Sequence, residues 1–284
     1  MNIGIVGLGL IGGSLAKAIR KRTSNNVFGY DISPFVVEQA CSCGAISSAL
    51  TDELLPQCDL VIVALYPADT VAYVTKKASL FRPGTIVMDC CGVKRAVCAS
   101  LEKVAENHQF LFLGAHPMAG AEYSGFAAAR ENLFDGASMI ITPSSFAPQT
   151  MIDLIDNLCR SIGFARLQRS TPEEHDFLIS YTSQLAHVVS CAYVSSENAA
   201  RFMGFSAGSF SDMTRVARLN EGMWTELFLT NGDYLANEVE AIATRLQEYA
   251  RVIRQQDSAA LFNLLKHAHQ SKELVESQRN AHTR

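Results

Sequence analysis

Residues 2–16 read NIGIVGLGLIGGSLA, and this pattern predicts a strand, a tight turn and a helix. The mainly apolar residues 3–6 form the strand, and the helix that follows has an apolar face. Three glycines, Gly7, Gly9 and Gly12, fit the spacing G-x-G-x-x-G between the two elements. Because this spacing lies between a strand and a helix, it indicates a turn that binds a dinucleotide.

Each glycine of this turn has its own physical role. Gly7 allows the tight turn, Gly9 lets the backbone approach a pyrophosphate, and Gly12 lets helix and strand pack closely. The helix then begins at Leu10 and Ile11, whose backbone N–H groups can donate to phosphate oxygens. We therefore expect these five residues to bind the cofactor.

An acidic residue at the end of the second strand indicates which dinucleotide binds. The strand covers residues 26–30, and Asp31 follows it 19 residues after Gly12, close to the separation of about 20 residues expected for an acid that binds the ribose hydroxyls. A carboxylate there repels a 2′-phosphate, so we expect NAD rather than NADP. Alternatively, Asp31 is a turn residue or a helix N-cap before Pro34.

The bulk composition excludes several classes of protein. A chain of 284 residues forms one large or two ordinary domains, and it can bury a core without metals or disulfides. The net charge of −4 gives no indication of nucleic acid or of a membrane surface as a partner. No apolar run reaches the roughly 18 residues of a membrane span, and the chain enters a strand at once. We expect a cytoplasmic protein.

The eight cysteines do not indicate a metal site. None of them forms C-x-x-C, and no histidine pairs with them at zinc-finger spacing. Most lie in apolar segments, where a cysteine behaves as a small hydrophobic residue. We expect reduced, mostly buried thiols and no bound metal.

The two halves of the chain have different patterns. Residues 1–166 alternate strands with helices, which predicts a doubly wound, Rossmann-type α/β sheet. The further strands are expected at 60–65, 85–89, 110–114 and 138–143, and the further helices at 34–43, 68–80 and 95–107. Residues 167–284 predict an all-helical domain that starts at the capping box 171–174, which reads TPEE.

A long amphipathic helix is expected from Tyr234 onward, because apolar residues recur there at steps of three and four. The apolar face of this helix belongs either to a bundle core within one chain or to an interface between subunits.

His116 is the first candidate for chemistry. It follows the strand 110–114, at the carboxyl edge of the sheet, where ligands bind in open α/β folds. A rigid His-Pro step and a loop with Gly120 and Gly125 suit a base held beside a cofactor. Alternatively, His116 is a loop histidine hydrogen-bonded to the backbone.

Two further candidates lie in the helical half. His187 lies on an apolar helical stretch, where a lone histidine is more often a core group. Arg215 suits carboxylate binding because its fork makes two parallel hydrogen bonds, although it could instead pair with Asp212. No lysine occurs between Pro143 and Lys266, which leaves histidine as the ordinary base at neutral pH.

Four blocks of sequence carry a resemblance to one enzyme family. They lie at 116–125 with 129–134, at 175–176, at 183–187, and at 212–217 with 223–224. Together with the glycine turn, they make the chain similar to the prephenate/arogenate dehydrogenases of tyrosine biosynthesis. The resemblance covers most of the chain, and it implies that the helical domain forms a homodimer.

The resemblance implies roles for single residues. His116 corresponds to the catalytic histidine, which hydrogen-bonds the ring hydroxyl of the substrate. His187 and Arg215 correspond to the pair that binds the substrate carboxylates, with Arg215 on the side-chain carboxylate. Glu122 and Asp212 match positions that shape and gate the site.

The implied reaction is the NAD-dependent oxidative decarboxylation of prephenate to 4-hydroxyphenylpyruvate. One alternative is an arogenate dehydrogenase, which gives tyrosine directly. Another is a non-catalytic protein that binds NAD and senses redox state.

The chain departs from the family pattern at two places. The family has a serine in a D-x-G-S-x-K turn, and Gly92 takes that place in the turn 89–94. The usual His and Pro before the second histidine are Gln184 and Ala186 here. We expect another hydroxyl donor or a water to replace the serine.

Overall fold

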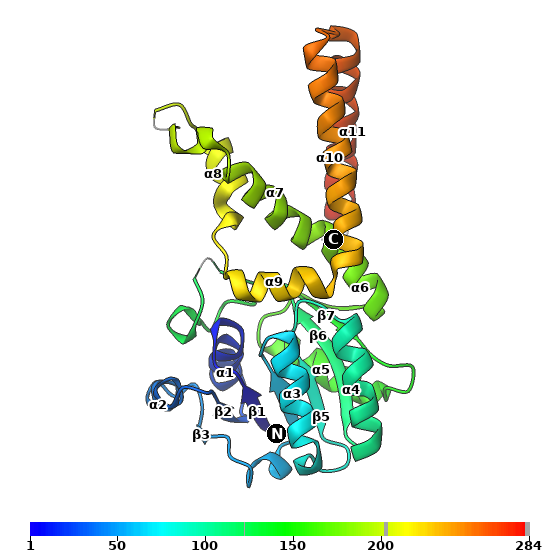
Figure 1. The fold of residues 1–284 in the computed structure, drawn as a ribbon. Helices are drawn as coiled ribbons and strands as arrows, with labels where there is room; N and C mark the ends of the chain where they lie inside the picture. Colours follow the sequence, from blue (N-terminus) through cyan, green and yellow to red (C-terminus); the bar gives the residue numbers. More distant parts are fainter. Residues whose placement is uncertain (122, 202–203, 282–284) are drawn as a thin grey trace. The chain divides into compact units, whose positions relative to one another are not determined.

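The computed structural model describes residues 1–121, 123–201 and 204–281 (Figure 1). These residues divide into two compact units, Met1–Gly232 and Asp233–Arg284, and each is described by itself. The domain boundary predicted after residue 166 lies inside a strand of the first unit, and the division into two functional domains stays a prediction.

The described residues of the first unit contain an eight-stranded sheet with the strand order β3-β2-β1-β4-β5-β6-β7-β8. The strands are β1 (Asn2–Val6), β2 (Asn26–Tyr30), β3 (Ser48–Ala49), β4 (Leu60–Val63), β5 (Ile86–Asp89), β6 (Leu111–Pro117), β7 (Ser138–Thr142) and β8 (Arg166–Arg169). Strands β1 to β6 are parallel, β7 runs antiparallel to β6, and β8 is parallel to β7. The predicted Rossmann-type sheet is confirmed.

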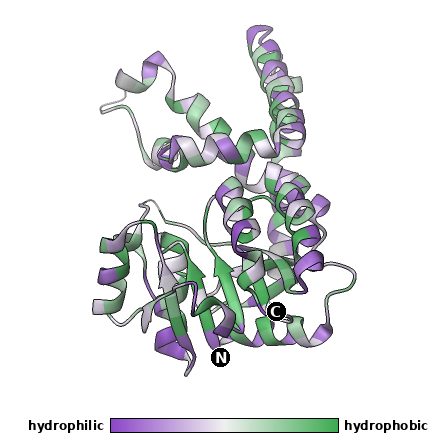
Figure 2. Cartoon of the chain, turned by 60° about the horizontal axis from the view of Figure 1, so that its bottom comes forward, coloured by the Kyte–Doolittle hydropathy of each residue, from purple (hydrophilic) through white to green (hydrophobic). Residues whose placement is uncertain are grey.

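Helices cover both faces of this sheet. They are α1 (Leu10–Arg22), α2 (Pro34–Ser42), α3 (Pro67–Lys77), α4 (Arg95–His108) and α5 (Gln149–Ser161). Leu60 and Ile62 of β4 share one core cluster with residues of α1, α2 and α5, whereas Val61 and Val63 share the other with α3 and α4. The inner strands are therefore apolar on both sides, as Figure 2 shows by their green colour.

The strand that carries His116 differs from the predicted one. β6 continues past Gly114 to Pro117, because its last residues pair with the antiparallel β7, with His116 opposite Ile140. His116 therefore lies within a strand and not in the loop after it, which corrects the sequence-based placement.

Four further α-helices lie among the described residues of the first unit. They are α6 (Pro172–Ile179), α7 (Leu185–Val194), α8 (Gly208–Thr214) and α9 (Glu221–Thr230). The predicted cap is present, since the Thr171 hydroxyl accepts a hydrogen bond from the Glu174 N–H at 3.1 Å. A π-helical turn, Ser180–Gln184, joins α6 to α7.

The second unit is a pair of long antiparallel helices, α10 (Gly232–Arg254) and α11 (Ser258–Ala281), side by side in Figure 1. The helix predicted from Tyr234 is confirmed. Gln256 turns the chain with φ +53°, and the Asp257 carboxylate accepts from the Ala260 N–H at 2.9 Å. Among the described residues, no helix is long and apolar enough to cross a membrane.

Candidate active site

The glycine turn between β1 and α1 has the geometry that the motif predicts. Gly7 has φ +84°, and a Cβ atom there would lie 2.5 Å from the Ala64 carbonyl oxygen. A Cβ at Gly12 would lie 1.9 Å from the Gly7 carbonyl oxygen, so a side chain would push the helix off the turn. Gly9 has no heavy atom within 4 Å of its Cβ position, which leaves its backbone open to a ligand.

The N-terminus of α1 suits an anion. Gly9 is the N-cap and offers no side chain, and no acidic residue lies in the first turn. The N–H groups of Leu10 and Ile11 therefore face no side-chain cap, and the helix dipole favours phosphate oxygens there. Together with the open space at Gly9, the turn fits the pyrophosphate of a dinucleotide.

Asp31 connects this turn to the end of β2. Its Oδ2 accepts from the Leu8 N–H and its Oδ1 accepts from the Ser33 N–H, both at 2.9 Å. Asp31 thus acts as a turn residue, which was its alternative role in the sequence analysis. Each of its carboxylate oxygens keeps a further acceptor site. Binding of ribose hydroxyls by Asp31 stays a prediction.

A buried ion pair, absent from the predicted site residues, lies beside the site. Lys94 is fully buried, pairs with Asp89 and donates to the Ala115 carbonyl oxygen at 2.7 Å. Burial alone would lower the pKa of Lys94, but the Asp89 carboxylate holds this pKa above its ordinary value. Lys94 is therefore a fixed cation that ties β5 to β6. Asp89 and Lys94 begin and end the turn 89–94, but the sequence does not reveal that Lys94 is buried, because lysine is rarely buried.

His116 is held neutral at the carboxyl edge of the sheet. Its Nδ1 lies 3.0 Å from Nε2 of His175, so its partner is a side chain and not the backbone. Burial, and then the neighbouring His175 and Lys94, lower the pKa of His116 well below its ordinary value. On the other side of the ring, Nε2 faces Gly92, whose Cβ position lies 3.9 Å away.

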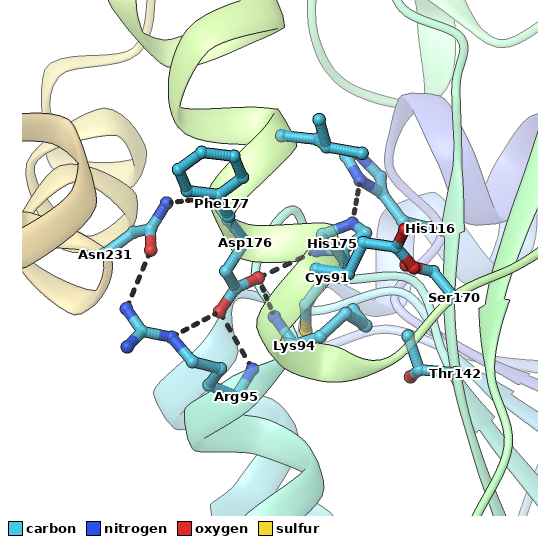
Figure 3. A network of polar contacts seen from close by, with 12 residues as sticks. Cys91, Lys94, Arg95, His116, Thr142, Ser170, His175, Asp176, Phe177 and Asn231 are labelled. Carbon is cyan, nitrogen blue, oxygen red and sulfur yellow. Dashed lines mark hydrogen bonds and ion pairs between the residues drawn. The ribbon is translucent and has the colours of Figure 1, made fainter. Parts of the chain in front are cut away.

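His175 and Asp176 extend this contact into the core (Figure 3). The Asp176 carboxylate lies 2.7 Å from Nδ1 of His175 and accepts from the backbone N–H groups of Lys94 and Arg95. Burial would raise the pKa of Asp176, but these hydrogen bonds hold it below its ordinary value. This pair is one of the four blocks that carry the family resemblance, but the resemblance did not assign it a role.

His187, Arg215 and Trp224 form a second group. His187 Nδ1 lies 2.8 Å from the Val216 carbonyl oxygen, and its ring centroid lies 3.8 Å from that of Trp224. Burial, opposed by this hydrogen bond, lowers the pKa of His187, and the Arg215 charge lowers it further.

Arg215 and Asp212 are both exposed, and no ion pair between them occurs among the described residues. The alternative interpretation of Arg215 as the partner of Asp212 therefore has no support in the described part of the chain. Glu122, the remaining predicted site residue, lies outside the described residues.

Helix α9 connects the two groups. It carries Trp224, which contacts His187, and Leu227, whose side chain lies 3.4 Å from the Cβ position of Gly92. Gly92 in turn faces His116, so α9 borders both the predicted base and the predicted carboxylate-binding residues. Figure 1 shows α9 lying across one end of the sheet.

A Rossmann-type sheet, an open glycine turn and a neutral histidine at the same edge define a class: dehydrogenases that use a nicotinamide dinucleotide. Comparison with known proteins gives the family within this class. Residues 15–167 match the nucleotide-binding domain of prephenate dehydrogenase, and residues 171–267 match its dimerization domain. The chain belongs to the prephenate dehydrogenase family, and it is an NAD-dependent dehydrogenase.

Individual relatives agree with this assignment. The chain is 30% identical to prephenate dehydrogenase of Bacillus subtilis, over 93% of this chain and 73% of the relative. It is 28% identical to cyclohexadienyl dehydrogenase of Zymomonas mobilis, over 95% of this chain and 94% of the relative. A crystal structure of prephenate dehydrogenase from A. aeolicus with hydroxyphenyl propionate and NAD+ superposes with a TM-score of 0.83 at 26% identity, covering 97% of this chain and 98% of that one.

Proposed function

We propose that the protein catalyses the oxidative decarboxylation of prephenate to 4-hydroxyphenylpyruvate, in the cytoplasm and as a step of tyrosine biosynthesis. The observation that carries the proposal is the neutral His116 at the carboxyl edge of the sheet, with its Nε2 facing the space beside Gly92. A neutral imidazole there can accept the proton of a substrate hydroxyl.

The proposed mechanism needs one proton acceptor that also returns the proton. Bound NAD would supply the acceptor for a hydride from the ring carbon that carries the hydroxyl. His116 Nε2 takes the hydroxyl proton as the ring C–O bond becomes a carbonyl. The bond between the ring and its carboxylate then breaks and CO₂ leaves. The electron pair of that bond makes the ring aromatic, and the ring oxygen takes a proton back from His116.

His187 and Arg215 are proposed to bind the carboxylates of the substrate. The Arg215 fork suits a carboxylate, and its exposed position beside His187 supports this role. Glu122 and Asp212 are proposed to shape the site, and the glycine turn with Asp31 to bind NAD. The helical residues 167–284 are proposed to form a homodimer.

Arg215→Ala tests the carboxylate assignment. A contact used equally in the ground state and the transition state raises KM more than it lowers kcat. We therefore expect a large rise in KM for prephenate with little change in kcat, and a smaller rise in Arg215→Lys. A large loss of kcat at unchanged KM contradicts the assignment.

The test of the function is the appearance of NADH when the purified protein is mixed with NAD and either prephenate or arogenate. Turnover of prephenate supports the proposal. Turnover of arogenate alone supports the second candidate, which the similarity to the Z. mobilis cyclohexadienyl dehydrogenase makes worth testing. NAD binding without turnover of either indicates a non-catalytic protein.

A further inference from the structure

His175 and Asp176 are buried residues that the proposed mechanism does not use, and they join His116 in one line of hydrogen bonds (Figure 3). Asp176 is 0% exposed and His175 is 2% exposed. Asp176 Oδ1 lies 2.7 Å from Nδ1 of His175, and Nε2 of His175 lies 3.0 Å from Nδ1 of His116.

The direction of these hydrogen bonds follows from Asp176. Its carboxylate accepts from the N–H groups of Lys94, at 2.7 Å, and Arg95, at 2.9 Å. These donors hold the pKa of Asp176 low, so the group is an anion and can only accept. His175 Nδ1 must therefore donate to it.

The same argument continues to His116. Burial lowers the pKa of His175, so its ring is neutral and carries its lone pair on Nε2. That lone pair accepts a hydrogen bond, and the Nδ1 of His116 must donate it. The lone pair of neutral His116 is then on Nε2, the nitrogen that faces Gly92. Among the described residues, no hydrogen bond reaches this nitrogen.

We propose that His175 and Asp176 are positioning residues that hold His116 in the tautomer with its lone pair on Nε2. The proposal rests on the proposed function of His116 as the base. When the substrate O–H bond breaks and the N–H bond forms at Nε2, the His116 ring becomes a cation. Its Nδ1–H then donates more strongly to His175, and the Asp176 anion stabilises the shared charge, as the aspartate of a catalytic triad does.

The charged groups around His116 have opposite effects on its protonation. The Lys94 ammonium, from the turn between β5 and α4, disfavours a proton on His116, and Asp89 of β5 neutralises much of that charge. The Asp176 carboxylate on α6 favours the proton through His175. The line of hydrogen bonds therefore offsets part of the cost of charging a partly buried histidine.

A purely structural role is the competing explanation. Asp176 also holds the start of α4 through Lys94 and Arg95, and Asn231 donates to the Asp176 carbonyl oxygen at 2.8 Å. Loss of the carboxylate could therefore loosen packing without any effect on the tautomer. The test needs a measurement that packing alone does not change.

The first measurement is the tautomer of His116 by ¹⁵N NMR of the whole protein, which needs no substrate. We expect the Nδ1–H form in the unchanged protein. In His175→Phe, where His116 Nδ1 has no ring nitrogen to donate to, we expect the Nδ1–H form to lose its preference. A His116 ring in the Nε2–H form in the unchanged protein overturns the proposal.

The second measurement compares substitutions of His175. His175→Gln can keep an acceptor near His116 Nδ1, whereas His175→Phe cannot. We expect kcat to fall by about 10²- to 10⁴-fold in His175→Phe, the scale of a lost general base, and by less than about tenfold in His175→Gln. The acidic limb of kcat/KM should shift in His175→Phe, because His175 is one of the groups that set the pKa of His116.

Asn231→Ala is the matched structural control, since it removes buried hydrogen bonds of the same network without touching a histidine. We expect lower stability, an unchanged His116 tautomer and an unchanged pH limb. Equal losses of kcat in His175→Gln, His175→Phe and Asn231→Ala overturn the proposal. If the unchanged protein does not oxidise prephenate, the proposed function fails, and the NMR result alone decides the positioning role.

Discussion

Gly92 lies where the family pattern has a serine, and the space around it permits one. A Cβ atom there would lie 3.4 and 3.5 Å from the Leu227 methyl groups and 3.9 Å from His116 Nε2, all ordinary contacts. We expect Gly92→Ser to fold normally and to place its hydroxyl within hydrogen-bond reach of His116. The kcat/KM for prephenate should stay within about threefold, less than 1 kcal/mol of transition-state stabilisation.

Gly92→Val is the matched control for this substitution. Its two methyl groups would press on Leu227 and cover His116 Nε2. We expect a loss of about 10²-fold or more in kcat/KM, as for a base that the substrate cannot reach, with NAD affinity retained. Steady-state kinetics and NAD titration check both variants, and full activity of Gly92→Val contradicts the assignment of Nε2 as the base.

The sequence could place His116 at the carboxyl edge of the sheet, although not within the strand, and it could not identify the partner of His116. A histidine after a predicted strand falls at the carboxyl edge of the sheet whatever the rest of the chain does. Its contact with His175 joins residues 59 positions apart, so it depends on how α6 packs on the sheet. The burial of Lys94 depends in the same way on Asp89 and Ala115, which the fold brings together.

At the scale of elements, the cap of α6 connects the sequence pattern to the site. Thr171 accepts from the Glu174 N–H at the start of the helix that carries His175 and Asp176. We expect Thr171→Ala to lower the free energy of unfolding by about 1 kcal/mol, the usual cost of a lost N-cap. Thr171→Ser should restore most of it, as urea unfolding can measure. Equal stability of all three proteins contradicts a role for the cap.

Several of the elements that the sequence predicted have a strong period. The buried strands β4 and β5 are continuous apolar runs, and α10 shows apolar residues at helical steps. β8 was missed because Arg166–Arg169 reads RLQR and has no apolar run to mark an edge strand. The extension of β6 to His116 was missed because β7 induces it by antiparallel pairing.

At the scale of the whole molecule, three histidines make stability depend on pH. The pKa values of His116, His175 and His187 are all lowered in the folded protein, mainly by burial. The unfolded chain takes up protons near pH 6.5, and the folded protein takes them up only at lower pH. Their contribution is therefore fully present above about pH 6.5 and is lost as the pH falls through the folded pKa values.

We expect the free energy of unfolding to fall from pH 6.5 to pH 5.5 by about 1 kcal/mol for each histidine that stays neutral when folded. Urea titrations at a series of pH values measure the slope. His116→Asn should reduce this slope, because one histidine fewer takes up a proton on unfolding, whatever the substitution does to absolute stability. A slope near zero in the unchanged protein contradicts the lowered pKa values.

The pair of long helices argues for a second copy of the chain. Six large apolar side chains of α10 and α11 are more than half exposed: Leu246, Ile253, Phe262, Leu265, Leu274 and Val275. Large apolar side chains exposed in this number on one pair of helices are typical of a protein interface, and residues 171–267 match a dimerization domain. We expect a homodimer in sedimentation velocity.

Two substitutions on α11 test where the interface lies. Phe262→Glu would bury a charge at the interface and should give monomers. Asn263→Glu adds the same charge on the next residue without removing apolar surface, and it should leave the dimer intact. A monomer in the unchanged protein would show that the apolar face of these helices has another partner, and a dimer that survives Phe262→Glu would place the interface elsewhere on the chain.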